Sequence, residues 1–435
     1  MMPSSPKLSK RARRPSRFTL IAIVLGILGF GALAVFGRAR YHLWAAEKAL
    51  KHYDFQDAQA HLDLYLKVRP SDADARLLAA QTARRLDDYE RAERELAKAV
   101  EQKGNREAIA LERSLLSAQQ GNLEAVERSL RARTDPDYPE AVLVLEALAK
   151  GYANRYRHMQ TLVCLNILLD RDPIHPHALL ARAHVWEDRA AHGEKDREQD
   201  ALQDYEKAVD LNPTFEARLG LAGTLYRVGR VQDALDQYER LLQMQPGHAE
   251  AIFGLARCRY SLHNVQESKQ LLQELLEQQP DHAGALLELG RVMIHEGRWA
   301  EAETWLRQAV AHSPRFHSEP VRVLCRCLEA ANKTEEARKC SVDLAQREAE
   351  VIEVERMTLQ AKREPFNSSL RFDIGRKLMA LGREQDGVAA LMTLVDLDPR
   401  NAQAHEALAE YFERAGQTDR ALRHRRAQSS SSVKP

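Results

Sequence analysis

Proline recurs at a nearly fixed interval through the middle of this 435-residue chain. Pro213, Pro246, Pro280 and Pro314 each follow an apolar stretch, and successive prolines lie 33 or 34 residues apart. Proline ends a helix because its ring removes a hydrogen-bond donor and clashes with the preceding turn. A fixed period of this length indicates one small structural unit that is repeated along the chain. Such a chain grows by stacking its units rather than by enlarging a single core.

The unit that runs from Ala283 to Pro314 shows the repeated pattern best. Its apolar residues lie three and four positions apart, which predicts amphipathic helices that each bury one stripe. The order of large, small and aromatic residues resembles that of the tetratricopeptide repeat, a pair of antiparallel helices. The resemblance is carried by Leu286, Leu289, Gly290, Met293, Gly297, Trp299, Ala302, Leu306, Ala309 and Pro314, with Met293 in place of the usual aromatic residue.

Three kinds of position in this unit have a direct physical explanation. Gly290 and Ala302 lie where the two helices are expected to touch, because a large side chain would push the helices apart. Gly297 is expected to let the chain turn between the helices, where a positive φ is often needed. Pro314 is expected to stop the second helix and to begin the next unit.

The same frame extends along almost the whole chain. It predicts about eleven units between residues 39 and 426, so the resemblance implies an all-α, right-handed tetratricopeptide-repeat solenoid. Most residues at the position equivalent to Ala302 are small, which fits a close helix contact in nearly every unit. These residues are Ala58, Ala92, Val126, Thr161, Ala201, Ala234, Ser268, Ala302, Ala337, Gly387 and Ala421.

Two units depart from the regular length. The fifth carries about five extra residues around 190–197, and their polar character predicts a longer loop between its helices. A charged run from about 335 to 362 has no turn signal. The second helix of the ninth unit is therefore expected to continue past the normal length before Pro365. The polar tail, residues 427–435, is expected to be disordered.

The first 37 residues differ from the repeats in composition. Residues 1–17 are rich in Lys and Arg, and the run from Phe18 to Phe36 has 19 residues without a charge. At 1.5 Å per residue that run spans about 28 Å, close to the thickness of a hydrocarbon core. We therefore predict a transmembrane helix, a signal-anchor, over residues 18–37. The basic segment should remain in the cytoplasm, which places the repeats on the periplasmic side of a bacterial-type inner membrane.

A cleaved signal peptide is the competing interpretation of the same segment. Ala32-Leu33-Ala34 fits the small-residue pattern of a cleavage site, and residues 18–31 would form the apolar region before it. The apolar run is longer than that region usually is, which favours the anchor. Both interpretations export the repeats.

No segment large enough for a catalytic domain remains between the membrane helix and residue 426. We therefore expect no enzyme activity, no catalytic residues and no cofactor. The chain has 64 basic and 63 acidic residues, so its net charge of +1 gives no field that favours nucleic acid.

Two sets of residues are candidates for other chemistry. Cys164, Cys258, Cys325, Cys327 and Cys340 match no metal-binding spacing, and their places in the repeat frame favour packing between helices. A bond between cysteines of neighbouring helices stays open, because only geometry decides it. His175, His177, His184 and His192 lie together in the fifth unit, where a transition metal would have suitable ligands. The favoured interpretation is a polar groove wall and a loop histidine, with no metal.

The resemblance also implies where partners bind. In tetratricopeptide-repeat proteins the first helix of each repeat lines a concave groove. The corresponding positions in this chain carry apolar residues, tyrosines and arginines, including one arginine in each of four successive units. They are Tyr226, Arg227, Phe253, Arg257, Tyr260, Leu287, Arg291, Arg322, Arg326, Phe372 and Arg376.

Arginine holds carboxylates in paired hydrogen bonds, and tyrosine adds rigid contact area with a polar end. An extended acidic peptide or an acidic helix would suit such a groove. The alternative is that the arginines pair with carboxylates of the groove itself, such as Glu250, Glu288 and Glu329.

The sequence thus predicts a membrane-anchored scaffold that binds protein or peptide partners, expected to be acidic, and that catalyses nothing itself. The alternative is an accessory subunit of an envelope system for polysaccharide export or for protein export and biogenesis. Such a subunit would also bind proteins, but it would depend on a catalytic partner. The sequence indicates no particular oligomeric state.

Overall fold

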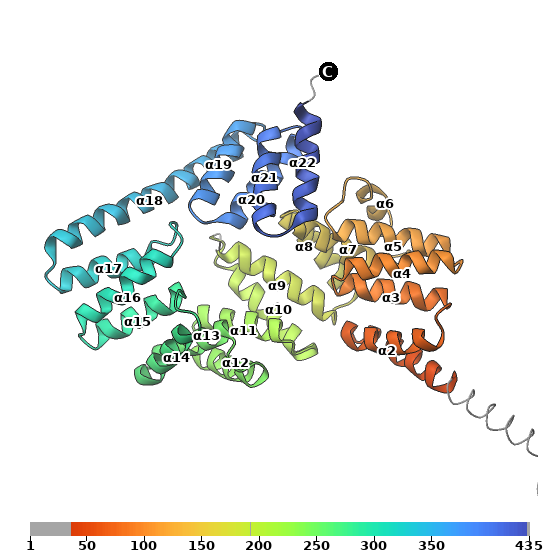
Figure 1. Cartoon of the computed structure of the whole chain (residues 1–435), viewed down its shortest axis with the longest axis horizontal. Coiled ribbons are helices and arrows are strands. Elements are labelled where there is room, and N and C mark those ends of the chain that lie inside the picture. The colour runs from red at the N-terminus through yellow and green to blue at the C-terminus, as the bar shows by residue number, and fades with distance from the viewer. Residues whose placement is uncertain (1–35, 192, 433–435) are drawn as a thin grey trace, which may run out of the picture. The chain divides into compact units, whose positions relative to one another are not determined.

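The structure, a computed structural model, describes residues 36–191 and 193–432 (Figure 1). These residues contain helices and turns but no strand. The predicted anchor at 18–37 lies almost wholly outside them, and none of the described helices is long and apolar enough to cross a membrane.

The described helices form eleven successive pairs, which confirms an all-α repeat architecture. In the first pair a helix over residues 36–51 precedes α2 (Phe55–Val68). The others are α3 (Ala73–Arg85) with α4 (Tyr89–Glu101), α5 (Arg106–Gln119) with α6 (Glu127–Arg131), α7 (Ala141–Asn154) with α8 (His158–Arg171), α9 (Pro176–Ala191) with α10 (Arg197–Leu211), α11 (Phe215–Arg227) with α12 (Val231–Met244), α13 (Ala249–Ser261) with α14 (Val265–Gln278), α15 (Ala283–His295) with α16 (Trp299–His312), α17 (Glu319–Ala330) with α18 (Thr334–Arg363), α19 (Ser368–Ala380) with α20 (Glu384–Leu397), and α21 (Ala402–Arg414) with α22 (Thr418–Ser432).

The pairs divide into two compact units, the first ending at Ala118 and the second beginning at Gln119. The core of the first unit contains an ion pair between Arg84 and Glu112, whose side chains are 0% and 1% exposed. A buried charge needs a partner, because an unpaired one would cost several kcal/mol of desolvation. The second unit contains the predicted groove residues.

One residue with a positive φ lies between the two helices of each described pair. Its φ ranges from 56° at Tyr156 to 104° at Gly193. Gly297, with φ 72°, confirms the predicted turn. Glycine adopts this conformation without steric cost, and Asn and Asp tolerate it better than most residues. The full set is Tyr53, Asp87, Gly121, Tyr156, Gly193, Gly229, His263, Gly297, Asn332, Gly382 and Gly416.

Close contacts at small residues hold the pairs and their neighbours together. A Cβ atom on Gly290 would lie 2.7 Å from the side chain of Leu306, which confirms the close approach predicted there. Between pairs, the Tyr205 ring of α10 lies against Gly220 of α11, where a Cβ atom would come within 2.3 Å of it. Tyr238 of α12 packs in the same way against Gly254 of α13.

The first helices of neighbouring pairs in the second unit also contact one another directly: α9 with α11, α11 with α13, α13 with α15, α15 with α17, and α19 with α21. In a curved stack the elements on the inner side lie closest together. The first helices therefore line the concave side, as the resemblance implied.

The irregular units follow the predictions only in part. Helix α18 has 30 residues, which confirms a second helix that continues to residue 363. In the fifth pair the insertion mainly lengthens α9 to 16 residues, because Ala190 and Ala191 continue the helix, and residues 192–196 separate α9 from α10. The expected disorder of 427–435 is wrong for residues 427–432, which belong to α22. A helix whose earlier turns are already packed extends at little cost.

Within the second unit, the turn after α7 contacts the C-terminal helices. Arg155 and Arg157 both donate hydrogen bonds to Asp396 of α20, with 2.8 Å from Arg157 Nε to Asp396 Oδ2. Tyr156 packs against the apolar cluster that α20, α21 and α22 share. Burial alone would raise the pKa of Asp396, but the hydrogen bond from Arg157 and the charge of Arg155 hold that pKa below its usual value. This contact joins helices that are more than two hundred residues apart in sequence.

The tyrosine–glycine contact predicts opposite effects for two substitutions in α11. Gly220→Ala should destabilise the second unit by roughly 1–3 kcal/mol, because its methyl group would overlap the Tyr205 ring. That ring is 0% exposed, and its hydroxyl is held by Glu187, so it has no room to move. Gly223→Ala should instead stabilise by about 0.5–1 kcal/mol, since alanine is the better helix former and the nearest atom, 3.6 Å away, ends the flexible Arg227 side chain. Thermal unfolding followed by circular dichroism measures both changes, and equal midpoints for the two variants would contradict the contact.

Candidate partner-binding groove

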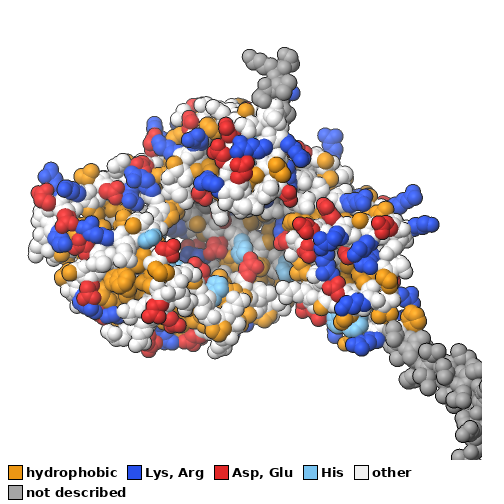
Figure 2. All heavy atoms as spheres, viewed as in Figure 1, with side chains coloured by type: hydrophobic (Ala, Val, Ile, Leu, Met, Phe, Trp, Pro, Cys, Tyr) orange, Lys and Arg blue, Asp and Glu red, His pale blue; other side chains and the backbone are white. Residues whose placement is uncertain are grey.

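The predicted groove residues lie on five successive first helices of the second unit. Helix α11 carries Tyr226 and Arg227, α13 carries Phe253, Arg257 and Tyr260, and α15 carries Leu287 and Arg291. Helix α17 carries Arg322 and Arg326, and α19 carries Phe372 and Arg376. In the space-filling view of Figure 2 the molecule is hollowed, and acidic and histidine side chains are visible inside the hollow.

Arg257 is held against two aromatic rings. Its guanidinium carbon lies 4.2 Å from the centre of the Tyr226 ring and 5.6 Å from that of Phe253. The Tyr226 hydroxyl in turn lies 3.1 Å from Ser261 Oγ, which fixes the ring. A cation over aromatic faces is attracted by their electron-rich surfaces. Arg257 is therefore positioned before any partner arrives.

Arg291 and Arg322 are already engaged with carboxylates. Arg291 donates to Glu288 at 3.0 Å and to Glu319 at 2.6 Å. Arg322 donates to Glu319 at 2.5 Å and to Glu348 at 2.8 Å. For these two arginines the structure favours the alternative in which groove carboxylates neutralise them. Glu288 was among the carboxylates named for that role, whereas Glu319 and Glu348 were not.

Glu288 lies close enough to Arg291 and Arg257 to feel both charges and is mostly buried, with 12% of its side chain exposed. Burial raises the pKa of this carboxyl, and the charges of Arg291 and Arg257 only partly oppose the increase. Ionisation of Glu288 therefore lowers the stability of the folded chain.

The remaining arginines differ from one another. Arg326 and Arg376 are exposed, and neither forms an ion pair within the described part of the chain. Arg376 lies 6.0 Å from the centre of the Phe372 ring. Arg227 donates to Glu187 at 2.7 Å. The groove thus has two arginines with free exposed heads and one, Arg257, held on aromatic rings.

The expectation for Leu287 is wrong, because this side chain is 5% exposed and belongs to the core between neighbouring pairs. Phe253 and Tyr260 are half-buried against the same core. Phe253, the fifth residue of α13, is only half-buried, whereas Leu287, the fifth residue of α15, turns into the core, so this position lies at the boundary between groove and core.

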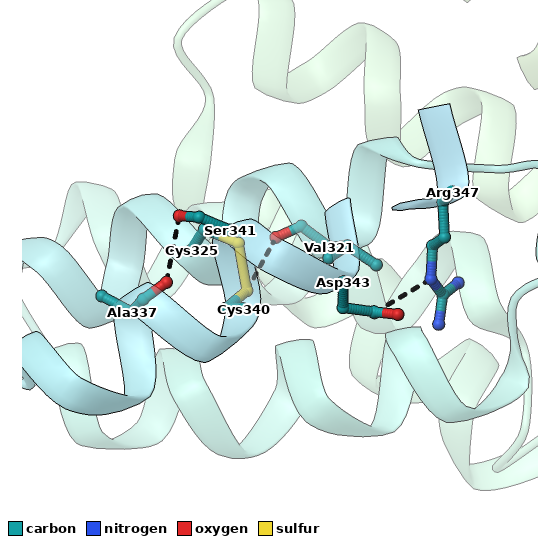
Figure 3. The surroundings of a disulfide bond; sticks show 7 residues. All are labelled: Val321, Cys325, Ala337, Cys340, Ser341, Asp343 and Arg347. Carbon is teal, nitrogen blue, oxygen red and sulfur yellow. Dashed lines mark hydrogen bonds and ion pairs between the residues drawn. A yellow bond between two sulfur atoms is a disulfide. The ribbon is translucent and has the colours of Figure 1, made fainter. Parts of the chain in front are cut away.

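A disulfide joins Cys325 of α17 to Cys340 of α18, with 5.4 Å between the two Cα atoms (Figure 3). The packing interpretation is therefore wrong for these two cysteines, whose positions face each other across the helix pair. It is confirmed for Cys164, Cys258 and Cys327, which are buried as free thiols. Burial raises the pKa of Cys164 to about 11 and that of Cys258 to about 12, so neither thiol is a ready nucleophile.

The histidines of the fifth pair do not converge. His175 is 1% exposed, and its Nδ1 accepts a hydrogen bond from the backbone of Ala178 at the start of α9. His184 Nε2 lies 3.9 Å from Glu216 on α11. His192 lies outside the described residues, and the residues that are described contain no group of three or more side chains placed to hold a metal ion.

Family models with the description tetratricopeptide repeat match several segments of the sequence. One matches residues 45–108 and 191–249, a second matches 225–283 and 263–319, and a third matches 347–431. Together these segments cover more than half of the chain. No curated protein matches the chain significantly.

Several solved structures are similar to parts of this chain at low sequence identity. PilW, described as a widely conserved type IV pilus biogenesis factor, is 17% identical over 47% of this chain and 92% of its own, with a TM-score of 0.40. PilF of Pseudomonas aeruginosa is 18% identical over 48% of this chain and 91% of its own, with a TM-score of 0.39. A tetratricopeptide repeat protein from Parabacteroides merdae is 14% identical over 67% of this chain and 99% of its own, with a TM-score of 0.35.

The burial of Glu288 makes the substitution Glu288→Gln informative. Because the folded chain holds the Glu288 proton more tightly than the unfolded chain does, this residue lowers stability as the pH rises through and above its usual pKa. The thermal midpoint of Glu288→Gln, relative to the native chain, should therefore be higher at pH 7.5 than at pH 4.5. Glu329→Gln, which changes an exposed residue of α17, is the control and should show no such difference. A midpoint for Glu288→Gln that falls relative to the native chain as the pH rises would contradict this assignment.

Proposed function

Because the chain belongs to the tetratricopeptide-repeat family, whose members bind protein or peptide partners, we propose that it is a scaffold without catalytic activity that binds an acidic protein segment. The segment would lie along the first helices α13 to α19, in the extended or helical form that such grooves accept. The chain would be held at a membrane by residues 18–37, with the repeats on the exported side.

The observation that carries this proposal is the row of arginines formed by Arg257, Arg326 and Arg376. Arg257 is held in place by Tyr226 and Phe253, so little side-chain entropy remains to be lost when it binds a carboxylate. Arg326 and Arg376 are exposed and form no ion pair with the described residues. A guanidinium presents paired donors that match the geometry of a carboxylate, so an acidic partner satisfies all three.

Groove carboxylates would lower the affinity for an acidic segment and increase the selectivity among such segments. Glu288 and Glu319 occupy Arg291, so a partner must either displace them or avoid that position. Their negative charge also repels an acidic segment that is shifted along the groove, which favours one register over others.

The disulfide supports export of the repeats. Bonds such as Cys325–Cys340 persist in oxidising compartments and are rare where thioredoxin and glutathione keep thiols reduced. Export is also what the basic segment 1–17 and the apolar run that follows it predict. The proposal therefore places the groove in the cell envelope.

Counting accessible thiols tests this location. Protein is taken from cells in acid, denatured, and labelled with a maleimide before and after reduction. If the repeats are exported, three cysteines should be labelled before reduction and all five afterwards, because only Cys325 and Cys340 are bonded. The buried free thiols Cys164, Cys258 and Cys327 provide the internal control for complete denaturation. Five labelled cysteines before reduction would contradict export.

Charge reversal tests the groove. Crosslinking and affinity capture from membranes would compare the native chain with a variant that carries Arg257→Glu, Arg326→Glu and Arg376→Glu. The proposal predicts that a partner captured by the native chain is retained at least about tenfold less by this variant, since each lost ion pair and each new repulsion weakens binding.

A second triple variant controls for net charge. Arg240→Glu, Arg338→Glu and Arg400→Glu change the same number of exposed arginines, two of them on second helices and one in a turn. This variant should capture the partner as the native chain does, and both variants should keep native helix content by circular dichroism. Equal capture by all three chains would show that the arginine row is structural.

A further inference from the structure

The second unit contains a cavity of about 320 Å³ where the turn after α7 meets the C-terminal helices. Its walls come from the segment before α6, from the turn after α7, and from α20, α21 and α22. The volume is about ten times the roughly 30 Å³ that one water molecule occupies in the liquid, so a small ion fits with some of its hydration. Neither the groove nor the proposed function uses this cavity.

Three arginines line the cavity: Arg155 from the turn, and Arg420 and Arg423 from α22. Arg420 donates to Gln417 Oε1 at 3.2 Å and to the carbonyl oxygen of Asn154 at 3.4 Å. Arg423 donates to the Asn122 side chain and to the carbonyl oxygen of Gln120. These acceptors are all neutral, so no direct ion pair with a described residue cancels the charge of Arg420 or Arg423.

Two carboxylates lie close to Arg155 and offset part of its charge. Asp396 is held by Arg155 together with Arg157, and each arginine has a second, longer ion pair, Arg155 with Glu124 at 3.9 Å and Arg157 with Glu127 at 3.6 Å. Glu124 has 88% of its side chain exposed, so water screens its long ion pair with Arg155, and Asp419 is also exposed. Arg155 Nε is buried and has no hydrogen-bond acceptor among the described residues. A buried donor without an acceptor is costly, and an anion in the cavity would supply one.

Two histidines add an acceptor to this set of donors. His405, which is 4% exposed, places its Nε2 atom 3.1 Å from the carbonyl oxygen of Pro399. Because a carbonyl only accepts, the proton of neutral His405 lies on Nε2, and its Nδ1 must accept. His424 Nδ1, 2.9 Å away, is therefore the donor to His405 Nδ1. This leaves His424 Nε2 with a lone pair that can accept a hydrogen bond.

We propose that the cavity binds inorganic phosphate in its hydrogen phosphate form, with Arg155, Arg420 and Arg423 donating to the phosphate oxygens and His424 Nε2 accepting from the P–OH group. Inorganic phosphate keeps at least one proton throughout the neutral pH range, whereas sulfate has none to donate. The pairing of donors and one acceptor therefore distinguishes two anions of the same shape and similar charge.

The surroundings keep His424 in the form that this binding mode needs. Burial, His405 and the charges of Arg155, Arg423 and Arg420 lower the pKa of His424 to about 4. Burial and the charges of Arg420 and Arg155 likewise lower the pKa of Arg423, although Asp419 opposes them. His424 is thus neutral at pH 7, and an anion among these cations relieves their mutual repulsion. Binding would also link Arg155 to α22 and so strengthen the contact between the turn and the C-terminal helices.

The first helix pair contains a matched histidine pair. His42 Nδ1 and His61 Nδ1 lie 2.9 Å apart, the same separation as in His405 and His424, but the cavity is not lined by them. The substitution His61→Gln therefore provides a control that changes an equivalent histidine outside the site.

Calorimetric titration of the purified full-length chain with sodium phosphate and sodium sulfate, at equal ionic strength and pH 7.5, tests the proposal. Phosphate should bind about tenfold more tightly than sulfate, the ratio expected for one unmatched buried hydrogen bond. Glycerol 3-phosphate, whose phosphate group loses its last proton near pH 6, should bind as weakly as sulfate at pH 7.5 and more tightly at pH 5.5.

Substitutions then assign the roles. His424→Asn keeps an amide donor for His405 but removes the acceptor at Nε2, so phosphate affinity should fall to the level of sulfate. Arg420→Gln should weaken both anions alike, and His61→Gln should change neither. Thermal midpoints without anion confirm that each variant is folded.

Equal affinity for phosphate and sulfate in the native chain, or no saturable binding of either, would overturn the proposal without any variant. Retention of the phosphate preference by a folded His424→Asn chain would overturn the role of His424. None of these outcomes depends on the groove, so the scaffold function and the phosphate site are tested separately.

Discussion

The close contact between the two helices of each repeat is the constraint on which the rest of this structure depends. Ala58, Ala92, Ala201, Ala234 and Ala302 occupy the same position in five repeats, and each is 0% exposed. At that position even a few added methylene groups would separate the helices, because protein interiors have almost no spare volume. The turn that precedes it adopts a positive φ in every described pair, which brings the second helix back against the first. Repetition of this one arrangement produces the stack, and the stack produces a curved surface lined by first helices.

Only some of the arginines on that surface are positioned and available to bind a charged partner. Arg257 is fixed by aromatic rings, whereas Arg291 and Arg322 share Glu288, Glu319 and Glu348. Fixing a cation without neutralising it keeps its electrostatic attraction for a ligand and removes much of the entropy cost of binding. Neutralising its neighbours limits the mutual repulsion of arginines on adjacent helices. The groove therefore combines a small number of available cations with a network that holds the remaining charges in place.

Tyr156 shows how a distant contact can override a local preference. It adopts a φ of 56° at the turn position that glycine occupies in other repeats, a conformation that costs a residue with a Cβ atom about 1–2 kcal/mol. Its ring packs on the apolar cluster of the C-terminal helices, and the neighbouring residues Arg155 and Arg157 bind Asp396. Glycine would adopt the turn more easily, but it would lose the packing. The same contact encloses the cavity that we assign to phosphate. The strained residue Tyr156 therefore lies in a turn that also supplies Arg155 to the wall of that cavity.

The sequence alone determined the period, the paired helices, the close positions at Gly290 and Ala302, the turn at Gly297 and the extended α18. All of these depend on residues within one repeat, where helix periodicity and turn preferences act over short separations. It also identified the first helices that carry Arg257, Arg291, Arg326 and Arg376. Only the tertiary structure decided that Cys325 bonds to Cys340, that Leu287 turns into the core, and that Glu319 rather than a partner neutralises Arg291 and Arg322. Those outcomes depend on side-chain direction across a helix pair or between repeats. The cavity is the feature that the sequence predicts least. Arg155 and Arg423 are brought together by the accumulated curvature of the stack, which no local pattern in the sequence encodes.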